Sequence, residues 1–242
     1  MRWKRHHIEI KESVITVLCP PSFIESGKKA VLDTRKQIED FIARYPEFKS
    51  SHTSLQPPPG SASLIKKMYQ ESGKVEVGPM AGIAGAVAEQ CLKQLLKAGA
   101  REAVVDNGGD IALFIRQPLK VGIYAGEGFS LNLALDLEPR NQPLGICTSS
   151  GTVGHSFSYG LADAALVISE NIVLADAAAT AVANRVHSPD DLNSCFDILT
   201  CLSEIEGSLV ILGDKISMWG KLPRIITSRD SRELITRGRG NE

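Results

Sequence analysis

The 242-residue sequence has almost no net charge and no long apolar run. Its 27 Lys and Arg against 28 Asp and Glu leave a formal charge of −1, which gives no electrostatic case for binding nucleic acid or an anionic membrane surface. No stretch is long enough to span a bilayer, and the charged N-terminus lacks the apolar run of a signal peptide. These absences predict a cytoplasmic protein that binds neither nucleic acid nor membrane, and they leave homo-oligomer formation open.

Paired cysteines, repeats and linkers are missing as well. The five cysteines are an odd number and none forms a Cys-x-x-Cys pair, so we expect reduced thiols and no structural zinc site. They are Cys19, Cys91, Cys147, Cys195 and Cys201. Without a repeat or a linker, residues 1–242 read as one domain that ends in a charged tail over 228–242.

Hydrophobic spacing predicts a mixture of strands and helices. Strands are expected over residues 7–19, 101–106, 111–115, 118–124, 130–135, 164–168, 209–212 and 224–227. Helices are expected over residues 26–45, 63–72, 79–96, 172–185 and 189–202. Because the strands of the middle third follow one another closely, the pattern predicts an α+β fold with a mixed, mostly antiparallel sheet packed with helices.

Residues 145–155, Gly-Ile-Cys-Thr-Ser-Ser-Gly-Thr-Val-Gly-His, concentrate polar chemistry more densely than any other stretch. The donors and small residues that could line a ligand are Thr148, Ser149, Ser150, Gly151 and Thr152. Glycine allows close backbone approach, and amides and hydroxyls supply donors for an anionic or phosphate-bearing ligand. The alternative is a Ser- and Gly-rich turn between two strands.

Two further segments combine small and acidic residues. Gly82 and Gly85 lie inside an expected helix, where each glycine costs about 0.5–1 kcal/mol relative to alanine. This indicates close approach by a ligand or another backbone, or close packing of the helix on a sheet. Asn107-Gly108-Gly109-Asp110 is either simple hairpin chemistry or the acidic corner of a site.

Asp176 and Thr180 are four residues apart and project from one face of an Ala-rich helix. An acid and a hydroxyl suit a hard cation such as magnesium, which takes oxygen ligands. The alternative is an Asp favoured by the helix dipole, with Thr180 bonding back to a backbone carbonyl.

Together these segments resemble the ApbE-like proteins, whose founding activity is FAD:protein FMN transfer. The resemblance rests on Gly82-Ile-Ala-Gly-Ala, Asn107-Gly-Gly-Asp-Ile111, Thr148-Ser-Ser-Gly151 and Ala175-Asp-Ala-Ala-Ala-Thr180. Pro46-Glu-Phe48, Val77-Gly-Pro-Met-Ala81 and Cys147 to His155 narrow it to the branch known as uncharacterised protein family 0280. The match covers about residues 8–226.

The resemblance implies a single ApbE-like domain that binds FAD, FMN or another phosphate-bearing small molecule. By analogy Asp176 and Thr180 would hold Mg²⁺, with a backbone oxygen of the Gly82-Ile83-Ala84 segment assisting. The flavin site would be bordered by Asn107, Gly108, Gly109 and Asp110. Two features depart from the family: Gly85 replaces a lysine, and a His-Ile-Ile-Asp-Pro segment is absent.

Cys147 supports a second hypothesis. A thiol in a donor-rich loop, eight residues before His155, could act as a nucleophile with the imidazole as base. Relatives on this branch have been linked to sulfur incorporation into amino acids, which points to persulfide transfer. The candidate catalytic residues are therefore Cys147, His155 and Asp110. A buried structural cysteine, or a non-catalytic ligand-binding subunit on the same scaffold, are the remaining alternatives.

Overall fold

The computed structural model describes residues 3–11, 13–126, 131–151 and 159–227. The strands are β1 (Lys4–Ile10), β2 (Ser13–Cys19), β3 (Ala103–Asn107), β4 (Asp110–Phe114), β5 (Leu119–Gly122), β6 (Leu133–Leu137), β7 (Leu144–Ser149), β8 (Ala164–Ser169), β9 (Ile205–Leu212), β10 (Lys215–Gly220) and β11 (Arg224–Thr227). The α-helices are α1 (Ile24–Arg44), α2 (Glu47–Ser50), α3 (Ser63–Lys74), α4 (Ile83–Lys97) and α5 (Ile172–Ala183). Short 3-10 turns are η1 (Pro21–Phe23), η2 (Pro79–Gly82), η3 (Pro189–Leu192) and η4 (Ser194–Leu199).

The strands form two sheets. The larger has eight strands in the order β1-β2-β3-β4-β7-β8-β9-β10, and the smaller has three in the order β11-β6-β5. Every pairing between described strands is antiparallel. The expected α+β class with a mostly antiparallel sheet is therefore confirmed.

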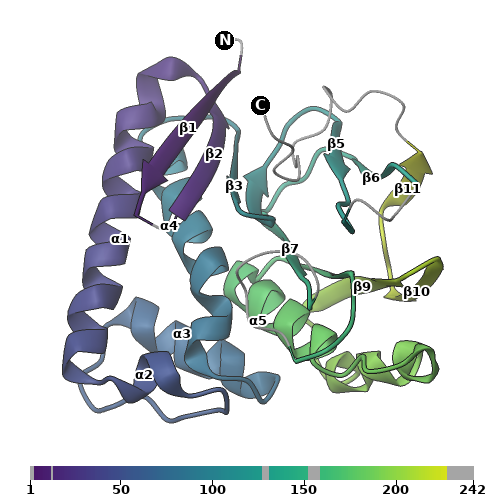
Figure 1. Ribbon diagram of the computed structural model, residues 1–242. Coiled ribbons are helices and arrows are strands. Elements are labelled where there is room, and N and C mark those ends of the chain that lie inside the picture. The colour runs from purple at the N-terminus through teal and green to yellow at the C-terminus, as the bar shows by residue number, and fades with distance from the viewer. Residues whose placement is uncertain (1–2, 12, 127–130, 152–158, 228–242) are drawn as a thin grey trace.

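Each face of the large sheet is covered by a different layer. Figure 1 shows the helices on one side and the small sheet of β5, β6 and β11 on the other. Because side chains alternate along a strand, two apolar cores result. Val105 and Cys147 belong to the core beneath the helices, whereas Val104 and Ile146 belong to the core between the sheets.

Helix α5 is the most deeply enclosed helix in the helical layer. All of its residues are buried except Thr180, because its small side chains let β7, β8 and α4 approach closely. None of the helices in the described ranges has the length and apolar character needed to cross a membrane.

Two expected elements are wrong, and one strand outside the polar stretch was not expected. The opening stretch is not one strand but a hairpin of β1 and β2, which turns at Lys11 with a φ of 52°. The helix expected over residues 189–202 is two 3-10 turns, η3 and η4. Strand β10 was not expected, although it pairs with β9 along its whole length.

Candidate functional site

The polar stretch that begins at Gly145 is a strand for half its length rather than a loop. Leu144–Ser149 forms β7 in the middle of the large sheet, hydrogen-bonded to both β4 and β8. Strand alternation therefore separates its hydroxyls: Thr148 shares the face of Ile146, and Ser149 shares the face of Cys147 beneath the helices. Ser149 is buried, and its Oγ has no hydrogen-bond partner among the described residues.

Ser150 and Gly151, directly after β7, contact the backbone at Gly160 and Ala162. The Gly151 amide donates to the carbonyl of Ala162 at 2.9 Å, and Ser150 Oγ lies 3.4 Å from the same carbonyl. A side chain at Gly151 would collide with the Gly160 carbonyl, since its Cβ would lie 1.8 Å from that oxygen. Thr152 and His155, both candidate site residues, lie outside the described residues.

The Asn107–Asp110 turn joins β3 to β4 and reaches the helical layer. Gly108 and Gly109 have φ of 70° and 105°, a left-handed backbone that favours glycine. Asn107 Nδ2 donates to the carbonyl of Ala84 at 3.1 Å. The hairpin and the start of α4 are thus fixed to each other.

The glycines at the start of α4 are explained by close contact with α5, not with a sheet. A Cβ at Gly82 would lie 2.8 Å from Val173 Cγ1. A Cβ at Gly85 would lie 2.8 Å from the Ile172 carbonyl oxygen and 2.9 Å from Asp176 Cβ. The position where the ApbE-like proteins have a lysine therefore has no room for any side chain in this protein.

Asp176 caps helix α4 from the neighbouring helix. The Gly85 amide donates to Asp176 Oδ2 at 2.7 Å, and the Ala84 amide is a second donor. These are amides of the first helical turn, which have no partner within their own helix. One edge of the Asp176 carboxylate is therefore held in a fixed direction.

Asp110 lies next to Asp176 in the same buried environment. The two side chains are hydrogen-bonded, and the Thr148 amide and the Cys147 thiol also bond to Asp110. Burial, followed by the charges of Asp176 and Asp106, raises the pKa of Asp110 well above its ordinary value. Burial likewise raises the pKa of Asp176 despite its amide donors. Oδ1 of Asp110 is buried with no hydrogen-bond partner among the described residues.

Cys147 is also brought to this cluster, but as a protonated thiol. It is fully buried, and its Sγ lies 3.7 Å from the Ile172 carbonyl oxygen. Burial and the neighbouring Asp110 and Asp176 raise the pKa of Cys147 well above its ordinary value. This environment opposes the thiolate that a nucleophile or sulfur carrier requires.

Thr180 connects the cluster with the surface. It lies one turn after Asp176 and is the only residue of α5 that is partly exposed. Asp110 belongs to β4, Ser149 to β7, and Asp176 and Thr180 to α5, and these three elements contact one another. Within the described residues, no three His, Cys, Asp or Glu side chains are grouped for a metal.

Two surface hollows lie away from this cluster. One of about 530 Å³ is lined by Lys67, Glu170, Asn171, Ser203, Glu204 and Glu206. The other, of about 230 Å³, is lined by Ser54, Leu55, Gln56, Pro57, Tyr69, Gln70 and Gly73. Neither includes an unpartnered carboxylate of the cluster, so we place the candidate site by its chemistry rather than by the size of a hollow.

Sequence reasoning missed the contacts that close the site. Gly160 lies against the end of α5, where a Cβ would be 1.8 Å from the Ala183 carbonyl oxygen. Asn184 follows α5, and its Oδ1 accepts the Tyr159 amide at 2.9 Å. A glycine between Tyr159 and Leu161 was the available sequence signal for this close approach.

Comparison with known proteins identifies the fold and the family. A family model described as "AbpE bacteria" matches residues 2–195. The UPF0280 protein of Methanocella arvoryzae is 42% identical over 95% of this chain and 94% of its own length. That of Methanothrix thermoacetophila is 42% identical over 97% of this chain and 99% of its own.

Solved structures agree on the fold. The apo flavinyl transferase ApbE of Pseudomonas stutzeri has a TM-score of 0.62 at 12% identity, covering 90% of this chain and 94% of its own. The flavin transferase ApbE of Vibrio cholerae has a TM-score of 0.61 at 12% identity, and the match covers 90% of this chain and 97% of its own. The chain has the ApbE-like fold and belongs to the UPF0280 family.

Proposed function

We propose that this protein binds a flavin nucleotide, with the phosphates of the ligand at the Asp176–Thr180 side of α5, and that it transfers the FMN half of FAD. The observation that carries the proposal is the buried Asp110–Asp176 pair. Asp110 Oδ1 has no hydrogen-bond partner among the described residues, and Asp176 lies one helical turn before the partly exposed Thr180. Similarity to proteins described as flavin transferases supplies the ligand class.

The residues fit a magnesium ion. Two adjacent carboxylates have raised pKa values, and among the described residues one of their oxygens has no hydrogen-bond partner and no cation is paired with them. Asp176 and Thr180 would hold the ion, and Asp110 lies beside them. When bound, Mg²⁺ would supply charge neutralisation and polarisation of a phosphoanhydride.

The protein's own groups have separate tasks in this proposal. The amides of Ala84 and Gly85 fix the Asp176 carboxylate, so that its remaining oxygen is presented in one direction. The Ser149 hydroxyl, which has no partner in the described structure, donates to a phosphate oxygen. Asn107 keeps the hairpin carrying Asp110 against α4.

In the transfer step, a hydroxyl oxygen of an acceptor protein forms a bond to the phosphorus of the FMN half. The bond between that phosphorus and the bridging oxygen breaks, and AMP leaves with that oxygen. The proton of the acceptor hydroxyl would pass to Asp110, which the charge of a Mg²⁺ held by Asp176 and Thr180 would keep ionised despite the burial that raises its pKa.

The test is titration of the purified protein with FAD, FMN and ATP, with and without Mg²⁺, by calorimetry. We expect magnesium-dependent binding of FAD that is lost in Asp176→Asn and retained in a control, Asp214→Asn, in the exposed β9–β10 turn. Absence of binding to all three nucleotides by the folded wild type would exclude the proposal.

Turnover is tested separately, by release of AMP from FAD in the presence of an acceptor protein. Binding without AMP release would favour the alternative of a non-catalytic subunit. The sulfur-transfer alternative requires a reactive Cys147, and the burial of that thiol gives it no support.

A further inference from the structure

Tyr159 and His52 form an exposed pair of aromatic rings, and the backbone at Tyr159 contacts Asn184, the residue that follows α5. Tyr159 is 63% exposed, the highest value among the large exposed hydrophobic residues described. Its ring meets the exposed His52 ring edge to face, with centroids 5.6 Å apart and planes at 81°. An edge-to-face pair leaves ring surface available for a further planar group.

The backbone that carries each ring is fixed by a hydrogen bond and a close contact. The Tyr159 amide donates to Asn184 Oδ1 at 2.9 Å, and the next residue, Gly160, lies directly against the end of α5. On the other side, the Gly78 amide donates to the His52 carbonyl at 3.1 Å. A Cβ at Gly78 would lie 1.9 Å from the Ser51 carbonyl oxygen, so this glycine permits the contact.

Helix α5 connects the aromatic pair with the acidic cluster. Asp176, Thr180 and Asn184 follow one another at intervals of four residues, and side chains four apart lie on the same side of a helix. Eight residues span about 12 Å at 1.5 Å per residue. A nucleotide with its phosphates at Asp176 and Thr180 would reach the rings with its sugar or ribityl arm extended along the helix.

We infer that the Tyr159–His52 pair is the ring subsite of this protein, on which the planar ring system of a bound nucleotide stacks. This inference rests on the proposed function, because that function places the phosphates at Asp176 and Thr180, on the side of α5 that leads to Asn184. Stacking needs only a flat aromatic surface, so it accommodates a flavin or an adenine ring. The chemistry common to both is a planar ring joined to a phosphate.

The experiment compares ligands that have a ring with one that does not. FMN, ADP and inorganic pyrophosphate are each titrated with Mg²⁺ into wild type, Tyr159→Ala and Tyr159→Phe. Tyr124→Ala is the matched control, since Tyr124 is also an exposed tyrosine but follows β5, a strand of the small sheet.

We expect Tyr159→Ala to weaken binding of a ring-bearing ligand about 5- to 150-fold, the range found for removal of a stacking side chain. Tyr159→Phe retains the aromatic face and should bind like wild type, as should Tyr124→Ala. Pyrophosphate binding should be the same in all four proteins. If FMN alone is weakened, the flavin lies on the pair; if ADP alone is weakened, the adenine does.

The two proposals fail in different ways. If wild type binds FMN or ADP and Tyr159→Ala binds both equally well, the ring subsite is excluded while the proposed function stands. If Tyr159→Ala also loses pyrophosphate, Tyr159 acts by shaping the phosphate site, and the stacking role is excluded. If wild type binds none of the three ligands, the proposed function fails and the ring subsite with it.

Discussion

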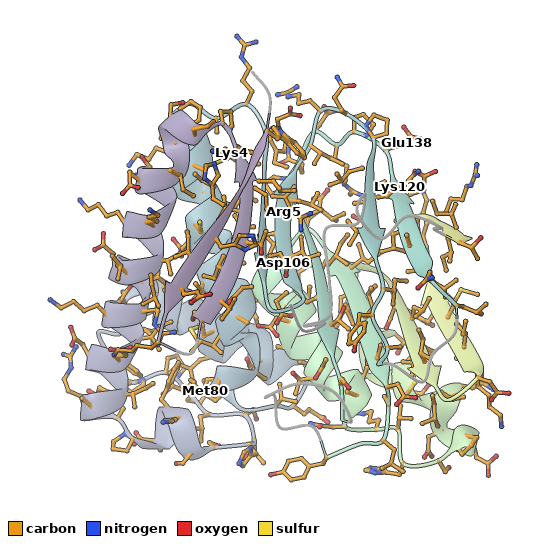
Figure 2. All side chains as sticks on the ribbon, turned by 45° about the horizontal axis from the view of Figure 1, so that its top comes forward. Lys4, Arg5, Met80, Asp106, Lys120 and Glu138 are labelled. Atoms are coloured by element: carbon orange, nitrogen blue, oxygen red, sulfur yellow. The ribbon has the colours of Figure 1, made fainter. Side chains whose placement is uncertain are left out.

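Asp106 and Asp110 flank the same Gly-Gly turn, yet their surroundings differ. Asp106 points to the core between the sheets, the side of Val104, and its Oδ1 accepts the Gly109 amide at 2.9 Å. Figure 2 shows Arg5 of β1 close to Asp106, and the guanidinium charge stabilises the carboxylate. Asp110 faces the helices and lies beside a second carboxylate, and one of its oxygens has no hydrogen-bond partner in the part of the chain that the structure describes.

The difference separates a structural acid from a candidate functional one. A buried carboxylate that accepts a turn amide and lies near a guanidinium has partners within its own fold. Two adjacent carboxylates with a free oxygen are not, and such arrangements are common where a ligand or cation completes the site. The sequence alone leaves both acids of the Gly-Gly turn equivalent, whereas the structure assigns them to opposite faces.

The largest expected effect tests whether Asp106 is structural. Burial raises the pKa of Asp106 from 3.8 to about 6. The folded state therefore binds this proton more tightly than the unfolded chain. Protonated Asp106 favours folding below pH 3.8, and this contribution is lost as the pH rises to about 6. Above that pH the buried charge costs about 3 kcal/mol, at about 1.4 kcal/mol per pKa unit.

Asp106→Asn removes the charge and keeps an oxygen that can accept the Gly109 amide. The variant should match wild type in urea denaturation near pH 3.5 and be more stable by up to about 3 kcal/mol at pH 7. Asp214→Asn, in an exposed turn, should give no such difference. A stability difference for Asp106→Asn that is constant across this pH range would contradict the assignment.

The next effect concerns Asp110. Asp110→Asn should weaken magnesium-dependent FAD binding about 10- to 100-fold, the usual cost of altering a group that supports a metal site. Asp106→Asn should leave that affinity unchanged, because its side chain lies on the other face of the sheet. Calorimetry on the two variants measures the contrast directly. Equal losses of FAD affinity in both variants would mean that Asp106 and Asp110 act as one unit, which would contradict their assignment to separate roles.

Gly85→Ala tests the contact that fixes Asp176, the partner of Asp110. The added Cβ would lie under 3 Å from the Ile172 carbonyl oxygen and from Asp176 Cβ. Overpacking costs about 1–3 kcal/mol and the gain in helix propensity offsets about 0.5–1 kcal/mol, so we expect a net destabilisation of up to about 2.5 kcal/mol.

The matched control for that variant is Gly73→Ala in α3, where the nearest atom to a new Cβ is 4.0 Å away. Relief of the glycine cost should stabilise the protein there by about 0.5–1 kcal/mol. Urea denaturation of both variants gives the comparison. If Gly85→Ala is as stable as Gly73→Ala, helix α5 can move away from α4 and the capping role of Asp176 is unimportant.

Several elements were predictable because their signals are local. Helices α1, α3, α4 and α5 have apolar spacing or small residues in series, and the motifs around Asp110 and Asp176 mark the acidic cluster. The β1–β2 turn was missed because Lys11 adopts a left-handed backbone without a Gly or Asn to indicate it. Strand β7 was missed because its Thr and Ser were interpreted as a loop, although their alternation suits a strand with two different faces.

The contacts within the site join residues that are far apart in the sequence, so no local pattern predicts them. Nothing in the sequence places Gly85 against Asp176, which is 91 residues away, or turns Cys147 into the interior beside two acids. These contacts depend on how α5 packs between α4 and β7. The residue types of the site could be selected from the sequence. The burial of these side chains, the directions in which they point and the shifts of their pKa values required the packed structure.

The smallest expected effect separates neighbouring hydroxyls of β7. Ser149 Oγ is buried beneath the helices and has no partner among the residues described. Ser149→Ala should therefore cost no stability and weaken FAD binding about 2- to 12-fold, as for the loss of one hydrogen bond. Thr148→Val, on the opposite face, should leave FAD affinity unchanged. Calorimetry gives the affinities, and urea denaturation confirms that both variants fold. A weaker affinity in Thr148→Val than in Ser149→Ala would place the ligand on the side of the small sheet, and Asp106 would then replace Asp110 as the acid of the site.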